Sequence, residues 1–319
     1  MTLMILAIVF GLALLVWSAD KFIEGASTVA LHAGMPPILI GMIVVGFGTS
    51  APEMVVSTIA ALENNSGIAL GNAYGSNIAN IGLILGLTIL LKPIFLHSSI
   101  VKKEIPILIG ISFLAGGILV DGELDSYDGY LLLLGFFTLV GWSIYSGLMK
   151  NNDPLASNVD KEISHNTHSL RYGVLWLVIG LILLIASSRL LVWGSVSLAQ
   201  AFGVSDLIIG LTIVAIGTSL PELASSIVAV YKNEHEIAVG NVVGSNMFNV
   251  LAVIGIAGSI SETSAPEEIL YRDWGVMILL TVLLYLISAR QKENGIGRKT
   301  GAIFLCIYVS YLVYLVFSQ

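Results

Sequence analysis

The sequence consists mostly of long apolar segments that are separated by short polar ones. A helix that crosses a membrane needs about 20 mostly apolar residues, and ten segments of the chain approach this length. We predict spans at residues 3–31, 37–62, 68–91, 104–120, 128–149, 172–200, 206–231, 237–260, 274–289 and 300–317. The pattern therefore predicts an all-α integral membrane protein with ten transmembrane helices.

One long polar stretch interrupts the apolar pattern near the middle of the chain. It covers residues 150–171 and reads KNNDPLASNVDKEISHNTHSLR, without the apolar periodicity that would indicate a folded domain. We interpret it as a linker between a first part, residues 1–149, and a second part, residues 172–319.

The composition supports the membrane interpretation. The chain has 319 residues, of which 56% are hydrophobic and 11% are charged, whereas soluble proteins carry about 25% charged residues. Cys306 is the only cysteine, so we expect neither an intrachain disulfide nor a cysteine metal cluster. The apolar N-terminal segment lacks the pattern of a cleaved leader peptide, and we expect it to form the first span. We expect a monomer in the lipid bilayer and no nucleic-acid partner.

Basic residues are distributed unevenly among the loops. With ten spans, the loops on one side of the membrane hold eleven lysines and arginines, and those on the other side hold only Arg272. The eleven are Lys92, Lys102, Lys103, Lys150, Lys161, Arg171, Lys232, Arg290, Lys292, Arg298 and Lys299. Because basic loops stay in the cytoplasm, we predict a cytoplasmic linker, both termini outside, and localisation in the inner (plasma) membrane of the cell.

The two parts of the chain share a repeated pattern of polar and small residues. A shift of 169 positions aligns residues 46–80 with residues 215–249, and 16 of these 35 positions are identical without a gap. Each part holds five predicted spans, and this odd number makes the second part enter the membrane from the opposite side. We therefore predict two inverted five-helix repeats, a common plan of secondary transporters.

The most conspicuous repeated strings are GTSAPE at residues 48–53 and GTSLPE at residues 217–222. Proline lacks a backbone N–H and clashes with the preceding turn, so both strings predict an interruption, in the second and the seventh span. Carbonyls that such a break frees at membrane depth must face protein, water or an ion, because lipid cannot bond to them.

Polar side chains that recur in both parts form one set of oxygen ligands. Glu53 and Glu222 are its central members, because a carboxylate at membrane depth is costly and functional by default. The recurring hydroxyl and amide side chains are Thr49, Ser50, Ser76, Asn80, Thr218, Ser219, Ser245 and Asn249. Oxygen ligands suit hard cations, and calcium takes about 6–8 of them. Two carboxylates would balance one calcium ion, and sodium ions could compete for the same oxygens.

The two copies of GTSxPE and of GNxxGSNxxN resemble the two alpha repeats of the cation/calcium exchanger superfamily, in particular its prokaryotic sodium/calcium antiporter branch. The resemblance extends over all ten predicted spans and implies that one calcium ion is exchanged for several sodium ions. It implies that the two glutamates bind both ions and that further ligands are Thr49, Ser50, Thr218, Ser219, Ser76, Asn80, Ser245 and the backbone carbonyls of Gly46 and Ala215.

The chain departs from the superfamily pattern at one pair of positions. Members often carry aspartate at one of the two positions that hold Asn80 and Asn249 here. The missing carboxylate weakens a potassium-coupled interpretation and leaves the number of exchanged ions open.

Several of these residues also have a purely structural interpretation. A serine or threonine in a spanning helix often bonds to its own backbone. The repeated glycines suit close helix packing; they are Gly71, Gly75, Gly240 and Gly244. Four repeated asparagines suit interhelical bonding and ligation equally well; they are Asn72, Asn77, Asn241 and Asn246.

Two cations lie within predicted spans, namely Lys21 and Arg189. Either one could in principle neutralise a buried glutamate. We expect them instead to reach the membrane interface or to pair elsewhere, for example with Asp20.

Other functions compete with sodium/calcium exchange. In a proton-coupled calcium exchanger, the two glutamates would carry the protons, and sodium dependence of the calcium flux would separate the two. An intramembrane serine hydrolase is not expected, because its nucleophile needs a base and all five histidines lie at or near loops. A channel is possible, but inverted repeats with interrupted helices favour alternating access. We expect neither an enzyme nor a cofactor.

Overall fold

The computed structural model describes residues 1–35, 37–63, 66–95, 103–149, 168–202, 215–265, 267–290 and 295–317. The regular elements of this part are helices and one small two-stranded sheet. Most of the predicted linker and residues 203–214, at the start of the predicted seventh span, lie outside the described residues.

The helices and strands follow one another in two similar series. The first series consists of α1 (Thr2–Ala33), α2 (Pro37–Leu39), η1 (Ile40–Gly46), α3 (Phe47–Thr49), α4 (Ala51–Leu62), α5 (Ser66–Ala79), η2 (Asn80–Leu85), α6 (Gly86–Leu91), α7 (Ile105–Ile118), η4 (Leu119–Asp121), β1 (Glu123–Leu124) and α8 (Ser126–Met149). The second consists of α10 (Leu170–Ala201), α12 (Ala215–Thr218), α13 (Leu220–Tyr231), α14 (His235–Phe248), η6 (Asn249–Ile254), α15 (Gly255–Ile260), β2 (Thr263–Ser264), η7 (Ile269–Trp274), α16 (Gly275–Ala289) and α17 (Arg298–Phe317). Among the η segments, η1, η2, η6 and η7 are π-helical.

The duplication predicted from the sequence is present in the secondary structure. Elements α4, α5, η2 and α6 recur 169 positions later as α13, α14, η6 and α15, each with the same length. The long helices α1 and α10, which open the two series, both have 32 residues.

Fewer described helices are long enough to span a membrane than the ten that we predicted. Seven described helices are long and apolar enough to cross a membrane, and the bent pair on either side of Ser50 makes eight if it counts as one span. The predicted spans 104–120 and 206–231 correspond to shorter apolar helices, Ile105–Asp121 and Leu220–Tyr231. Within the predicted span 206–231, the break at Ser219 precedes α13, and residues 206–214 lie outside the described residues. The all-helical membrane architecture is thus confirmed, and the count of ten stays a prediction.

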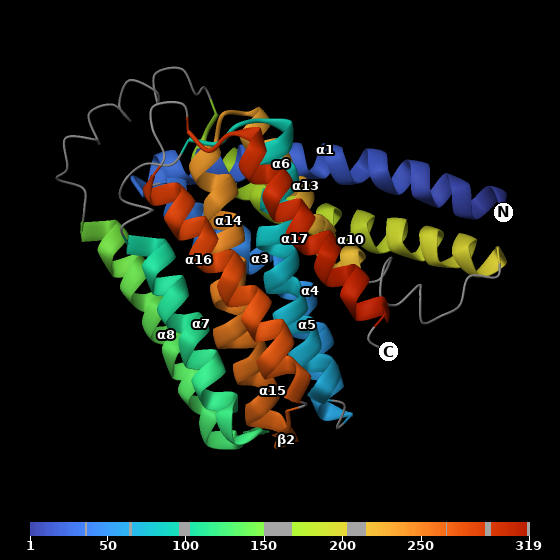
Figure 1. Ribbon diagram of the computed structural model, residues 1–319. Coiled ribbons are helices and arrows are strands. Elements are labelled where there is room, and N and C mark those ends of the chain that lie inside the picture. The colour runs from blue at the N-terminus through green and yellow to red at the C-terminus, as the bar shows by residue number, and fades with distance from the viewer. Residues whose placement is uncertain are drawn as a thin grey trace.

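Helices α1 and α10 lie side by side and project from the rest of the bundle (Figure 1). Glycines allow the close contact between them. A Cβ atom on Gly180 would lie 2.8 Å from the backbone of Phe22, and one on Gly11 would lie 3.0 Å from the backbone nitrogen of Leu191. The two opening helices therefore form a tightly packed pair.

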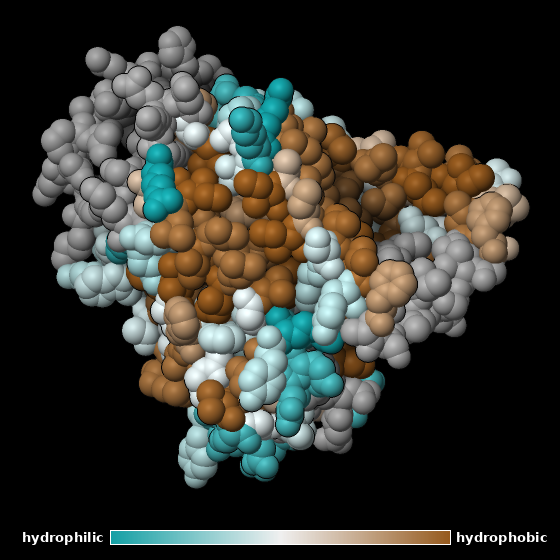
Figure 2. Space-filling model, in the orientation of Figure 1, coloured by the Kyte–Doolittle hydropathy of each residue, from teal (hydrophilic) through white to brown (hydrophobic). Residues whose placement is uncertain are grey.

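The centre of the bundle is α14, in which every residue from Ile237 to Phe248 is buried. The outer helices expose large apolar side chains instead, for example Phe10, which is 61% exposed, and Phe137, which is 67% exposed. Figure 2 shows a broad hydrophobic belt across the middle of one face and along the projecting helices, with hydrophilic residues above and below it. An exposed apolar surface of this extent fits contact with lipid.

Loops of the two halves contact each other in a reciprocal way. Strand β1 pairs with β2, which follows α15, and Leu124 lies opposite Thr263. At the corresponding place after α6, Ile94 forms an isolated bridge with Ile296 of the other half. Each contact joins two loops that the ten-span prediction places on the same side of the membrane.

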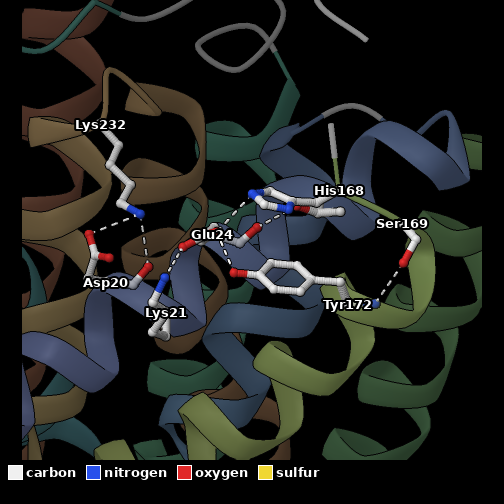
Figure 3. Close-up of polar contacts among 8 residues, drawn as sticks. Asp20, Lys21, Glu24, His168, Ser169, Tyr172 and Lys232 are labelled. Atoms are coloured by element: carbon white, nitrogen blue, oxygen red, sulfur yellow. Dashed lines mark hydrogen bonds and ion pairs between the residues drawn. The ribbon is translucent and has the colours of Figure 1, made fainter. Parts of the chain in front are cut away.

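Polar contacts join α1 to the loop after α13 and to α10 (Figure 3). The Nζ atom of Lys232 lies 2.9 Å from Asp20 Oδ1. Lys21 pairs with Glu24 at 2.7 Å, and the hydroxyl of Tyr172 donates to the same carboxylate at 2.9 Å. The suggested pairing of Lys21 with Asp20 is therefore wrong, because residues three apart share a helix face and adjacent residues do not.

Arg189, the other basic residue within a predicted span, lies exposed on α10. Lys21 is already paired with Glu24. Neither side chain is therefore placed as the counter-charge of a buried glutamate, in agreement with the expectation.

Candidate functional site

The helix breaks lie where the repeated strings predict them. Ser50, with φ −82° and ψ 2°, separates α3 from α4, and the helical segments on its two sides are bent by 45°. Ser219, with φ −93° and ψ 9°, separates α12 from α13 in the same way. A proline stands in the first turn after each break, where its missing N–H is tolerated.

The prolines leave backbone carbonyls without a helical donor. Pro221 has no N–H to offer to the carbonyl of Gly217, four residues earlier. The hydroxyl of Ser188, on α10, donates to this carbonyl at 3.0 Å. The carbonyl of Gly46, by contrast, keeps the helical bond from Ser50 N at 3.0 Å, and it also accepts from Ser245 Oγ at 3.3 Å.

Glu53 and Glu222 lie near the start of the helices after the two breaks. Both lie in the first turn, where the helix dipole favours a negative charge, and both are only 1% exposed. Ser50 Oγ of the first half donates to Glu222 Oε1 of the second half at 3.2 Å. The structure thus brings together two carboxylates that are far apart in sequence.

The remaining hydroxyls of the predicted set are in different situations. Thr49 Oγ1 lies 3.0 Å from Val45 O, within its own helix, and 3.1 Å from Asn241 Oδ1. Ser219 Oγ is buried and has no hydrogen-bond partner within the described ranges. Ser76, on α5, is 6% exposed, and Thr218 is half-buried. Ala215 is the first residue of α12, and the ligand role of its carbonyl stays a prediction.

Two repeated asparagines fasten the broken helices to their neighbours. Asn72 Nδ2 donates to Glu53 O at 3.2 Å and to Ser57 Oγ at 2.9 Å. In the second half, Asn241 Nδ2 donates to Glu222 O at 3.1 Å and to Ser226 Oγ at 2.9 Å. These bonds favour the interhelical interpretation of Asn72 and Asn241. Sequence reasoning missed the two serines, although they are identical in the two repeats and could have been found there.

Asn80 and Asn249 open the π-helical segments η2 and η6. Both are 1% exposed, and their Oδ1 atoms have no hydrogen-bond partner in the part of the chain that the structure describes. π-helical turns within α-helices are frequent at functional sites. The extra residue in the turn widens the backbone beside both amides.

Five buried oxygens have no hydrogen-bond partner among the described residues: Glu53 Oε2, Glu222 Oε2, Ser219 Oγ, Asn80 Oδ1 and Asn249 Oδ1. Leaving such atoms buried without a partner is unfavourable, and more so for a carboxylate. The described residues contain no group of three or more His, Cys, Asp or Glu side chains that could hold a metal ion. A cation here would therefore rely on two carboxylates together with neutral oxygens.

Comparison with known proteins identifies the family of the chain. The family model described as sodium/calcium exchanger protein matches residues 3–145 and 172–317. The sodium/calcium exchanger MaX1 of Methanosarcina acetivorans is 31% identical over 98% of this chain and 99% of its own length. The inner membrane protein YrbG of Escherichia coli is 38% identical over 97% of this chain and 95% of its own length.

A solved structure has the same fold. The sodium-calcium exchanger NCX_Mj, from crystals soaked with Na⁺ and Ca²⁺, superimposes with a TM-score of 0.84 at 32% identity, covering 98% of both chains. The repeated motifs, the family model and these matches over nearly the whole length agree. The chain belongs to the sodium/calcium exchanger protein family.

Proposed function

We propose that this protein is a secondary active antiporter that exchanges calcium for sodium across the membrane by alternating access. The observation that carries the proposal is the pair of buried carboxylates, Glu53 and Glu222, each with an unpartnered oxygen. They lie at helix breaks in two copies of one repeat, which is the usual position of the substrate site in transporters of this plan. The names of the relative MaX1 and of the solved exchanger support the choice of ions.

The proposed ligands provide oxygen only. They are Glu53, Glu222, Thr49, Ser50, Thr218, Ser219, Ser76, Asn80, Ser245, Asn249 and the carbonyls of Gly46 and Ala215. Calcium accepts about 6–8 oxygens in a flexible arrangement. Two carboxylates balance one calcium ion, whereas sodium ions use the same oxygens at lower charge. Because the two ions share ligands, binding of one displaces the other, and this competition couples their movements.

The membrane orientation of the proposal follows from the basic loops. The protein lies in the inner (plasma) membrane of the cell. With ten spans in two inverted repeats, both termini lie outside and the linker at 150–171 lies in the cytoplasm. A contact between two loops supports this arrangement. Lys92 Nζ, after α6, donates to Val230 O at the end of α13 at 2.9 Å and to Asn233 Oδ1 after α13 at 2.8 Å. Both loops belong to the predicted cytoplasmic side.

Purified protein in liposomes tests the function. Vesicles are loaded with sodium and diluted into sodium-free buffer that contains radioactive calcium; control vesicles contain potassium or choline instead. We expect calcium uptake only when sodium is inside, with no uptake driven by a pH gradient alone. Uptake that follows the pH gradient and ignores sodium would favour the proton-coupled alternative. Uptake without any counter-ion gradient would indicate a channel.

A further inference from the structure

Four buried asparagines form two reciprocal pairs between α5–η2 and α14–η6. Asn80 Nδ2 donates to Asn246 Oδ1 at 2.9 Å, and Asn249 Nδ2 donates to Asn77 Oδ1 at 3.1 Å. All four residues are 1% exposed. Each pair therefore joins an asparagine of one half to an asparagine of the other half, out of contact with solvent.

The pairs fix which end of each amide faces which way. An asparagine side chain has an NH₂ group that donates and a carbonyl oxygen that accepts, and the two ends are almost equal in shape. Because Nδ2 of Asn80 and of Asn249 is engaged in the pair, Oδ1 is the atom that remains without a partner in both. A rotated amide would present hydrogens instead, which repel a cation.

The carbonyl oxygens of the other two asparagines are each engaged in one of the pairs. The Oδ1 atoms of Asn77 and Asn246 already accept the bonds from Asn249 and Asn80. Their own NH₂ groups are held as well, because Asn77 Nδ2 lies 3.3 Å from Met277 Sδ and Asn246 Nδ2 donates to Asn77 O at 3.4 Å. The hydrogen bonds given for the side chains of Asn77 and Asn246 therefore involve neither Glu53 nor Glu222.

We propose that Asn77 and Asn246 are positioning residues that hold the carbonyl oxygens of Asn249 and Asn80 toward the transported ions, and that they are not ligands themselves. This inference rests on the proposed function. It decides between the two interpretations that the sequence left open for this pair. Partners that orient a metal ligand typically contribute about 10- to 100-fold to metal affinity.

A double-mutant cycle separates this role from a general structural one. The single variants are Asn77→Ala, Asn246→Ala, Asn80→Ala and Asn249→Ala. The coupled doubles are N77A/N249A and N246A/N80A, and the crossed doubles N77A/N80A and N246A/N249A serve as matched controls. The readouts are the apparent KM for calcium in sodium-driven uptake, the maximal rate, and the calcium-induced shift of Tm in detergent.

We expect N77A and N246A to raise the apparent KM about 10- to 100-fold. Because each variant leaves a buried NH₂ group without its acceptor, we expect a modest decrease in the Tm of the ion-free protein, and the decisive readout is a smaller calcium-induced shift of Tm. In the coupled doubles, the second substitution should add less than about twofold, because the amide that it would misorient is already absent. In the crossed doubles, the two effects should multiply.

Three results would overturn the proposal: an unchanged KM in both single variants, equal effects in coupled and crossed doubles, or loss of folding in both N77A and N246A. The last result would make the two residues structural. If wild-type protein shows no sodium-driven uptake, the proposed function fails. The Tm shift with calcium still measures the cycle in that case, so the two failures are distinguishable.

Discussion

Single residues set the charge of the site, because Glu53 and Glu222 are its buried carboxylates. Replacing either one with glutamine preserves the shape and leaves one negative charge to balance a divalent ion. Removing one partner of a buried charge interaction costs about 3–5 kcal/mol, and each 1.4 kcal/mol is about tenfold in affinity. We expect sodium-driven calcium uptake by Glu53→Gln and Glu222→Gln to fall below detection while both variants fold.

A matched control lies at the other end of the same helix. Glu63, the residue after α4, is exposed, and Glu63→Gln should transport calcium like the wild type. If Glu53→Gln or Glu222→Gln exchanged ions at the wild-type rate, that glutamate would be excluded from the site.

Asn249 offers a test of a neutral ligand. Its Oδ1 atom is buried and unpartnered, so Asn249→Ala removes a candidate oxygen without changing the net charge. We expect the apparent affinity for sodium or calcium, measured by uptake at varied ion concentrations, to fall about tenfold. Asn249→Asp should instead change affinity by adding a carboxylate. Unchanged affinities and maximal rate in Asn249→Ala would make it a packing residue.

Ser188 illustrates a residue that supports the site from outside the repeated strings. Ser188→Ala would leave the Gly217 carbonyl without its hydroxyl donor, and an unsatisfied buried acceptor costs about 1–3 kcal/mol. We expect a lower Tm in detergent for this variant. Ser187→Ala is the control, because the described partner of Ser187 Oγ is Leu184 O of its own helix, at 2.9 Å. Equal Tm values for the two variants would contradict this role.

At the scale of helices, α14 packs against the η1 segment through glycines. A Cβ atom on Gly244 would lie 2.5 Å from Met42 O, and one on Gly240 would lie 2.6 Å from Ile38 O. At Gly75, which corresponds to Gly244 in the first half, a Cβ atom would meet no described atom within 4 Å. The packing interpretation of the repeated glycines is therefore confirmed in the second half.

This difference between equivalent helices leads to a prediction. Gly244→Ala forces the backbones of α14 and η1 apart, and overpacking of this kind costs about 1–3 kcal/mol. We expect a markedly lower Tm and slower exchange for Gly244→Ala, and values near the wild type for Gly75→Ala. A destabilisation of equal size in both variants would show that the two helices are packed alike.

Some elements can be predicted from the sequence and others cannot. The breaks at Ser50 and Ser219 are predictable because glycine and proline act on the backbone locally. The π-helical turns at Asn80 and Asn249 are not, since no local signal distinguishes their hydrogen bonds from those of an α-helix. The bond from Ser188 depends on how α10 packs, and Ser188 has no counterpart in the first half, where Ala19 occupies the equivalent position.

For the whole molecule, the uneven basic loops predict the orientation. Asn158 lies in the linker, outside the described residues, and Glu262 lies in an exposed loop on the predicted outer side. In a Cys306→Ser background, a cysteine at Asn158 should react with an impermeant thiol reagent only after the cells are opened. A cysteine at Glu262 should react in intact cells. Labelling of Asn158→Cys in intact cells would contradict the topology.

The overall plan is more predictable than the count of its parts. Repetition of Gly, Asn, Pro and Glu in register cannot arise from apolar composition. The duplication can therefore be recognised from the sequence alone. Length and hydropathy alone, by contrast, cannot show that α7 is short or how many crossings the broken helices make. The pairing of Asn80 with Asn246 and of Asn249 with Asn77 also escapes the sequence, because it depends on how α5 and α14 cross.

The reciprocity of the asparagine pairs has an evolutionary consequence. Asn80 and Asn77 belong to one half, and the partners that they contact belong to the other. A single ancestral unit with both asparagines could have made the same two bonds with a second copy of itself, inserted upside down. If the pairs orient the ion ligands as proposed, loss of the asparagine at position 77 or 246 in one half would impair a ligand of the other half. The asparagines of both halves would then be retained together, even where other positions of the two repeats have diverged.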